Sequence, residues 1–99
     1  MNITKTKNGS ALTVALEGRM DATSAPQLEA LLKTEMESIT DLTLDLKDLA
    51  YTSSAGLRVL LSAQKTMNKK GKMVIRNVSP DIMEIFDMVG FTDLLNIEE

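Results

Sequence analysis

Two kinds of hydrophobic spacing alternate along this 99-residue chain, and together they restrict the folds it can adopt. Apolar side chains occupy every second position in residues 11–17 and again in 42–47, which is the spacing of strands with one buried face. Elsewhere apolar residues recur at intervals of three and four, which is the spacing of amphipathic helices. The sequence therefore predicts strands that alternate with helices around one core.

Three helices are expected, and each has a recognisable beginning or end. The first begins at 24–27, Ser-Ala-Pro-Gln, which resembles a capping box with proline in the first turn. The second runs from Ala55 to Asn68 and stops at 69–71, Lys-Lys-Gly, where glycine suits a left-handed cap. The third begins at Ser79-Pro80 and ends at Gly90, and one more short turn is expected beyond it.

The expected order of elements is β-β-α-β-α-β-α. A weaker strand over 3–6 is joined to the first clear strand through Asn8-Gly9, a dipeptide suited to a tight hairpin turn, and a short strand over 72–76 follows the second helix. Alternating strands and helices favour parallel neighbours with right-handed crossovers, so the hairpin supplies the antiparallel pair. The predicted fold class is α/β with a mixed sheet, in a single domain over residues 1–99.

The composition excludes several classes of function. The chain contains no His and no Cys, so the commonest general base, the commonest metal ligand and the strongest nucleophile are absent. The glycine spacings that cradle nucleotide phosphates do not occur. With 11 basic and 14 acidic residues, the chain lacks the positive charge that nucleic acids select. We therefore expect no enzyme, no catalytic or metal-binding residue, no cofactor and no nucleic-acid partner.

The expected location is the cytoplasm. No segment approaches the roughly 20 apolar residues that cross a bilayer, and the first residues do not form a secretory signal. The absence of Cys is typical of a reducing compartment. Membrane insertion is therefore not expected.

The chemically informative stretch is the polar segment 51–54, Tyr-Thr-Ser-Ser, before the second helix. If Ser54 is the N-cap, its side chain lies beside free backbone amides at the positive end of the helix dipole, which favours a phosphate. A phosphoserine there would add nearly two negative charges and alter a binding surface without unfolding the helix. The alternative is that Ser53 and Ser54 only cap the helix. Gly56 indicates a close backbone approach, either by a docking partner or by the sheet.

The segment 53–58, Ser-Ser-Ala-Gly-Leu-Arg, resembles the anti-sigma factor antagonist (anti-anti-sigma factor) family, whose fold is the STAS domain. Residues 16–21, followed by a capped helix, and residues 77–91 are similar to other segments of the same family. The resemblance covers nearly the whole chain. It implies a STAS-type single domain with a four- to five-stranded mixed β-sheet covered by about three to four α-helices.

The resemblance also implies a function in bacterial transcription regulation. The unphosphorylated protein would bind an anti-sigma factor and release a sigma factor. The anti-sigma factor would have serine kinase activity and switch binding off by phosphorylating Ser54, and a PP2C-type phosphatase would restore binding. Ser53 remains an alternative acceptor, because it stands where the family often has an Asp and Ala55 stands where a second Ser is common.

The same fold occurs in proteins that do not switch sigma factors, including transporter tails, stressosome scaffolds and a component of lipid transport. The main alternative is therefore a non-phosphorylated protein-interaction subunit. By resemblance, Asp21 and Asp45 would lie near the serine loop, although each could equally be a strand-end residue that stabilises a turn. The face from Lys65 to Lys69 is a further candidate contact. The predicted partner-binding residues are Asp21, Thr52, Ser53, Ser54, Gly56, Leu57 and Arg58.

Overall fold

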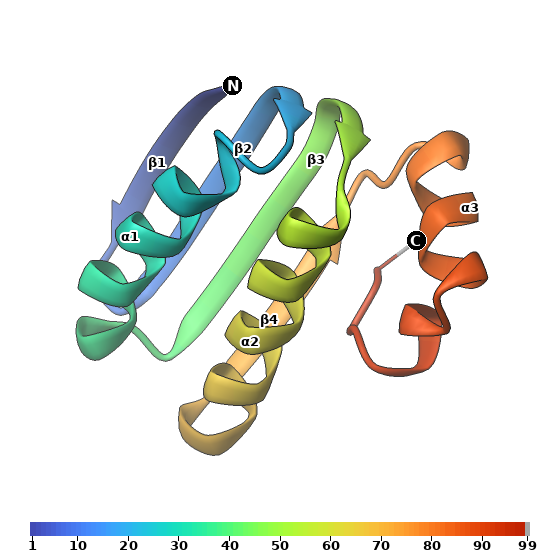
Figure 1. Ribbon diagram of the computed structural model, residues 1–99. Coiled ribbons are helices and arrows are strands. Elements are labelled where there is room, and N and C mark those ends of the chain that lie inside the picture. Colours follow the sequence, from blue (N-terminus) through green and yellow to red (C-terminus); the bar gives the residue numbers. More distant parts are fainter. Residues whose placement is uncertain (99) are drawn as a thin grey trace.

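A computed structural model of the protein describes residues 1–98 as a four-stranded sheet with helices on one face and along one edge (Figure 1). The observed order of strands and helices confirms the predicted β-β-α-β-α-β-α sequence of elements. The elements are β1 (Asn2–Asn8), β2 (Ala11–Met20), α1 (Ala25–Glu35), the 3₁₀ helix η1 (Met36–Ser38), β3 (Asp41–Thr52), α2 (Ser54–Lys70), β4 (Lys72–Arg76), α3 (Pro80–Met88) and the 3₁₀ helix η2 (Phe91–Asp93).

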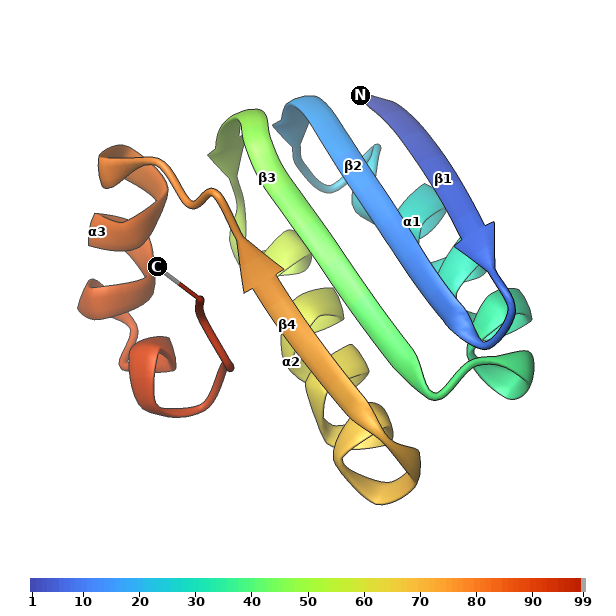
Figure 2. The ribbon, with the colours of Figure 1, turned by 180° about the vertical axis from the view of Figure 1, so that it is seen from behind.

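The sheet is mixed, as predicted. Its strands lie in the order β1-β2-β3-β4; β1 and β2 are antiparallel, and β2, β3 and β4 are parallel. Helices α1 and α2 cover one face, and α3 lies beside the β4 edge (Figure 1). Seen from behind, the opposite face of the sheet has no described helix in front of it (Figure 2).

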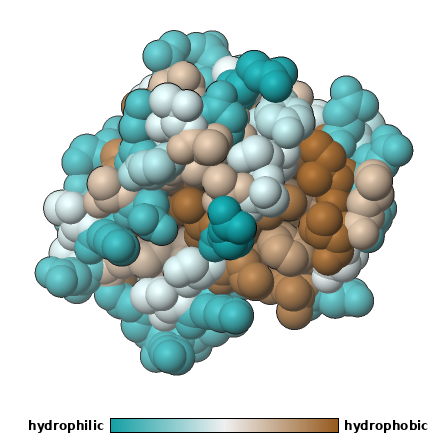
Figure 3. Space-filling model, in the orientation of Figure 1, coloured by the Kyte–Doolittle hydropathy of each residue, from teal (hydrophilic) through white to brown (hydrophobic). Residues whose placement is uncertain are grey.

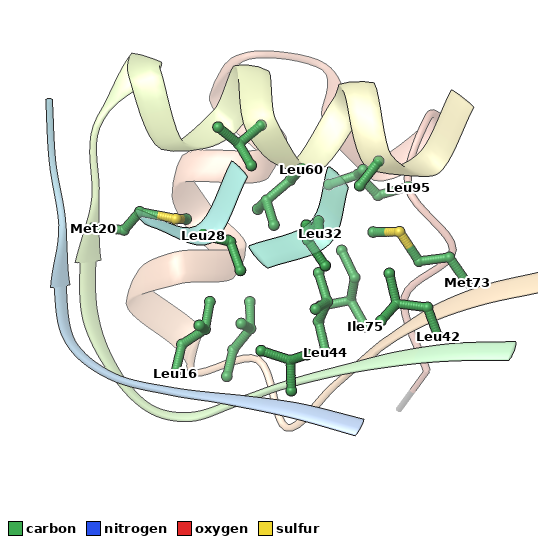
Figure 4. Close-up of a cluster of buried hydrophobic side chains, with 14 of the residues drawn as sticks. Leu16, Met20, Leu28, Leu32, Leu42, Leu44, Leu60, Met73, Ile75 and Leu95 are labelled. Atoms are coloured by element: carbon green, nitrogen blue, oxygen red, sulfur yellow. The ribbon is translucent and has the colours of Figure 1, made fainter. Parts of the chain in front are cut away.

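The core lies between the sheet and helices α1 and α2, and α3 and Leu95 also contribute side chains to it (Figure 4). The predicted alternation holds, because every second side chain of β2 and of the first half of β3 is almost completely buried. Removing such a side chain from water stabilises the fold by about 1.5–3 kcal/mol. The largest fully buried side chains are Leu12, Leu16, Met20, Leu28, Ile39, Leu42, Leu44, Leu46, Leu60, Met67, Met73 and Phe86.

The hairpin turn begins one residue later than predicted. Asn8 pairs with Ala11, so the two-residue loop is Gly9-Ser10. Gly9 has a φ of 65°, and Asn8 has no positive φ. A positive φ at the first loop residue alone is the pattern of a type II′ turn, in which glycine is the favoured residue.

Strand β3 is longer than predicted, since it continues to Thr52 into the segment that was expected to be a loop. Its pairing register with β2 shifts twice, and Lys47 and Asp48 are exposed side by side. Such an irregularity breaks the period of two and bends the strand. The extension brings β3 as far as the start of α2.

The predicted end of the second helix differs from the structure, whereas the third helix agrees with it. Gly71 does not adopt a left-handed conformation, since its φ is 175°. Its requirement for glycine comes from packing, because a Cβ there would clash with the carbonyl oxygen of Thr40. The third helix is confirmed: the Ser79 hydroxyl accepts a 3.2 Å hydrogen bond from the Ile82 amide, and Gly90, with φ 75°, follows the helix.

Residues 96–98 lie along the free edge of β4. Ile97 forms a parallel bridge with Ile75, whose amide donates to the Asn96 carbonyl at 2.9 Å and whose carbonyl accepts from the Glu98 amide at 2.8 Å. The Asn96 side chain also donates to the Met73 carbonyl at 3.1 Å. This segment therefore pairs with backbone groups that an exposed edge strand would leave open.

Candidate functional site

The serine pair lies where β2 and β3 end and α2 begins. These two strands are parallel, so their carboxyl ends meet at the same edge of the sheet. The Ser53 amide donates to the Met20 carbonyl at 2.8 Å, which fixes the β3–α2 connection against the end of β2. The chain that follows β2 therefore lies beside the first turn of α2.

Ser53, and not Ser54, is the N-cap of α2. Its backbone is extended, and its hydroxyl accepts a 3.4 Å hydrogen bond from the Gly56 amide. Ser54 is the first residue of the helix. The hypothesis that Ser54 caps the helix is therefore wrong by one residue.

Ser54 is exposed, and its hydroxyl forms no hydrogen bond with any residue in 1–98. The first turn of α2 contains no acidic residue. Negative charge at such a position is stabilised by the helix dipole and by backbone amides that have no partner within the helix. The geometry therefore leaves this hydroxyl accessible to modification and its surroundings suited to a negatively charged group.

Gly56 packs against the sheet. It is buried, and a Cβ at this position would clash with the Thr52 hydroxyl and approach Met20 side-chain atoms to 2.8 Å. The packing of α2 on the ends of β2 and β3 therefore accounts for this glycine. No approach by a partner is needed to explain it.

The predicted partner-binding residues divide into two groups by exposure. Thr52 and Leu57 are only 2% and 6% exposed, and Gly56 is also buried. These three hold the start of α2 on the sheet and present little surface to a partner. The accessible members of the predicted set are Ser54 and Arg58, which are exposed, and Asp21 and Ser53, which are half-buried.

Asp21 organises the loop that enters α1. Its carboxylate accepts hydrogen bonds from the amides of Ser24 and Thr23, both at 3.0 Å, and the Ser24 hydroxyl donates to it at 3.1 Å. These hydrogen bonds, from Ser24 first and then Thr23, hold the pKa of Asp21 below its ordinary value of 3.8. Asp21 is thus a carboxylate at neutral pH.

The predicted capping box at Ser24 is wrong. The Ser24 hydroxyl makes no side-chain cap of α1; it donates to the Arg19 carbonyl at 2.8 Å and accepts from the Asp21 amide at 2.9 Å. Ser24 therefore ties the loop after β2 back onto the end of that strand.

Asp45 does not take part in this site. It lies in the middle of β3, and its carboxylate accepts from the Lys47 amide and the Asn77 side chain, both at 3.0 Å. The Lys47 amide, followed by the Asn77 side chain, lowers the pKa of Asp45 from its ordinary value. This carboxylate fastens the connection after β4, away from the serine pair.

An interaction near the ends of β2 and β3 was not predicted from the sequence. The Arg19 guanidinium lies 4.3 Å from the centre of the Tyr51 ring, and the two residues are register partners. Such a cation–π contact contributes about 0.5–1 kcal/mol at an exposed site. The two residues are neighbours because of the pairing register of β2 and β3. That register is irregular and could not be predicted from the sequence.

Neither a metal centre nor a membrane-spanning helix is present in the part of the chain that the structure describes. Residues 1–98 contain no group of three or more acidic side chains placed to hold a metal ion. No helix among them is long and apolar enough to cross a bilayer.

The fold and the site define a class of protein. The family model described as "STAS domain" matches residues 2–99, and the chain belongs to this family. It is 32% identical over 98 residues to the "Anti-sigma-B factor antagonist" of Bacillus subtilis, and the alignment covers 98% of this chain and 90% of that protein. It is 33% identical over 99 residues to the "Putative anti-sigma factor antagonist BtrV" of Bordetella bronchiseptica, covering 98% of this chain and 85% of that protein. The predicted membership of the anti-sigma factor antagonist family is confirmed.

Solved structures agree on the fold. The anti-sigma factor antagonist SpoIIAA in its unphosphorylated form has a TM-score of 0.85 at 17% identity, covering 99% of this chain and 89% of that chain. The Bacillus cell fate determinant SpoIIAA in the phosphorylated form has a TM-score of 0.78 at 17% identity, covering 99% of this chain and 92% of that chain. These similarities confirm the predicted STAS-type fold.

Proposed function

We propose that this protein is an anti-sigma factor antagonist whose binding is switched off by phosphorylation of Ser54. The unphosphorylated form binds an anti-sigma factor with serine kinase activity and thereby releases a sigma factor. The kinase phosphorylates Ser54, and a PP2C-type phosphatase reverses the modification. The protein acts in the cytoplasm by binding and not by catalysis, as one STAS domain over residues 1–99.

The observation that carries this proposal is the division of roles between the two serines. Ser53 caps α2 with its hydroxyl, whereas the Ser54 hydroxyl is exposed and makes no hydrogen bond within residues 1–98. A phosphate on Ser54 leaves the cap in place and adds nearly two negative charges to the surface at the positive end of a helix. The modification therefore changes the binding surface while the fold is preserved.

Ser53 is the less suitable acceptor for the same reason. Its hydroxyl already accepts a hydrogen bond from the Gly56 amide, and the residue is half-buried. Phosphorylation there would compete with the cap. The known forms of SpoIIAA, which shares the fold, include a phosphorylated one, and this supports a phosphorylation switch on the same scaffold.

The decisive experiment is intact-mass and peptide mass spectrometry after incubation with ATP and a candidate anti-sigma factor kinase from the same genome. Wild type should gain one phosphate, and Ser54→Ala should gain none. Ser53→Ala is the matched control and should still be phosphorylated. Absence of phosphate from all three proteins would favour the alternative of a non-phosphorylated STAS interaction subunit, as in a stressosome-like scaffold or a lipid-transport complex.

Binding to the same kinase provides the functional test. Ser54→Asp should weaken the complex because it adds negative charge at the phosphorylation position, whereas Ser54→Ala should bind as wild type does and stay bound in the presence of ATP. Equal affinity of all three proteins would contradict a switch at Ser54.

A further inference from the structure

The outward side of α2 carries charge of one sign. The helix contains four basic residues and no acidic one, in a chain whose net charge is −3. Three of the basic residues, Arg58, Lys65 and Lys69, lie on one side of the helix, opposite its buried residues. This basic stripe is about 17 Å long at 1.5 Å per residue.

The surface along the basic stripe forms a shallow depression. Arg58, Lys65 and Lys69 line this depression together with Leu61, Ser62 and Thr66. Leu61 is half-buried and is the one large apolar side chain among these six. Figure 3 shows the face of the molecule that carries α1 and α2, where hydrophilic side chains are spread over the helices and apolar ones gather toward α3. The depression thus offers cations around a single apolar contact.

These cations are not engaged by the rest of the molecule. The ion pairs within residues 1–98 join Lys5, Lys7, Lys33 and Arg76 to acidic residues, and no side chain of α2 takes part. Lys69 lies near the carboxyl end of α2, where the helix dipole favours a cation. Arg58 lies in the second turn from the amino end, where the dipole gives a cation no such stabilisation.

We propose that the basic stripe binds an acidic segment of the anti-sigma factor, an inference that rests on the proposed function. Carboxylates of that segment would lie along Arg58, Lys65 and Lys69, and an apolar side chain would lie over Leu61. Ser54 lies four residues before Arg58, so the two residues are neighbours on the helix surface. Phosphate on Ser54 offsets the positive charge at that end of the stripe and repels the incoming carboxylates. The switch thus acts through the charge of the docking surface.

A protein partner fits this surface better than a nucleic acid does. The three cations of the stripe, on a chain of net charge −3, would neutralise few phosphates, and affinity for nucleic acid depends on the number of phosphates neutralised. A protein segment can also use the apolar contact at Leu61, because complementary charge and one buried apolar anchor are typical of a specific interface.

The test compares two double charge reversals that change the net charge equally. Lys65→Glu/Lys69→Glu alters the basic stripe, and Lys47→Glu/Lys72→Glu alters exposed positions on β3 and β4. Affinity for the same candidate anti-sigma factor kinase is measured across a salt series, and circular dichroism verifies that both variants are folded. We expect the stripe variant to bind at least about tenfold more weakly at low salt and to lose most of the salt dependence, with the control close to wild type.

The outcomes separate this inference from the proposed function. If Ser54→Asp weakens binding but the stripe variant matches the control, the stripe proposal is overturned and the switch remains. If the kinase does not bind wild type, both fail. A 20-base-pair DNA duplex is tested in the same buffers, and binding to it that depends on the stripe, without such dependence for the kinase, would overturn the choice of a protein partner.

Discussion

At the scale of single residues, Ser53 and Ser54 are neighbours with different physical roles. Ser53 satisfies a backbone amide of α2, and the Ser54 side chain contributes nothing comparable to the fold. We expect Ser53→Ala to lower the free energy of unfolding by about 1 kcal/mol and Ser54→Ala to change it by less than about 0.5 kcal/mol. Urea denaturation measures both, and Ser79→Ala, which removes the cap of α3, is the positive control. Equal losses at both serines would contradict these roles.

Gly56 provides a test in which two physical effects have opposite signs. Helix propensity alone predicts that Gly56→Ala stabilises the protein by about 1 kcal/mol. The clash with Thr52 and Met20 predicts a loss of about 1–3 kcal/mol, because the buried neighbours have to move. We expect the loss, measured by denaturant unfolding, with Ser62→Ala on the exposed side of the same helix as a control. A more stable Gly56→Ala protein would show that the start of α2 is not tightly packed.

Asp21 makes stability depend on pH. Its pKa in the folded protein lies below the ordinary value of 3.8, because Ser24 and Thr23 donate hydrogen bonds to its carboxylate. The stabilisation is therefore fully present above that ordinary value, and it is lost as the pH falls through the lower folded pKa. We expect the stability difference between wild type and Asp21→Asn to shrink as the pH is lowered below 3.8 in a series of urea unfolding curves. A difference that stays constant from pH 7 to about pH 2 would contradict this role.

At the scale of elements, the spacing of hydrophobic residues predicted the fold well where the strands pair in a regular register. Strand β2, the first half of β3 and helix α3 are found close to where their patterns place them. The second half of β3 was missed because Lys47 and Asp48 are both exposed, which breaks the alternation. The polar pair Tyr51-Thr52 was then predicted to be part of a loop, although Thr52 is buried against Gly56.

The start of α2 was predicted to within one residue along the chain, and the difference decides which serine is the cap. The sequence placed the start of α2 at Ala55, with Ser54 as its cap, but the helix begins at Ser54 and the cap is Ser53. Local sequence could not distinguish the two serines, because both are good N-caps. The choice depends on the Ser53 amide pairing with Met20 on a neighbouring strand, which is a tertiary contact.

The junction between α2 and β4 depends on a glycine for a reason that sequence did not reveal. A Cβ at Gly71 would clash with the backbone carbonyl of Thr40, which also accepts a 2.8 Å hydrogen bond from the Lys72 amide. A backbone group held in this way yields less readily than the flexible Met20 side chain near Gly56. We therefore expect Gly71→Ala to lower the unfolding free energy by more than Gly56→Ala does, in the same denaturation assay. A smaller loss at Gly71 would indicate that the junction shifts easily.

At the scale of the whole molecule, residues 96–98 connect two layers of the fold. The Asn96 amide donates a 3.0 Å hydrogen bond to the side chain of Gln64, which is 4% exposed on α2, while neighbouring residues pair with β4. The segment thus ties a covering helix to the edge of the sheet and shields that edge.

Removing this segment should destabilise the protein and expose a sheet edge. For a chain ending at Leu95, we expect the unfolding free energy to fall by at least about 1–3 kcal/mol, because the buried Oε1 of Gln64 loses the amide that donates to it. Self-association should also increase with concentration, because an open strand edge pairs with other chains. Unfolding curves and sedimentation velocity measure the two effects. Arg76→Ala, which removes only the exposed ion pair with Glu98, is the control and should cost less than about 1 kcal/mol.

The exposure of Ser54 also has a kinetic consequence. A hydroxyl engaged in a helix cap is available only while the helix end is frayed, so the rate of any reaction on it is scaled by the small open fraction. The Ser54 hydroxyl is available in the fully folded molecule. Under the proposed function, the speed of the switch is therefore set by encounter with the kinase or phosphatase and by their chemistry, and changes in helix fraying leave it unaffected.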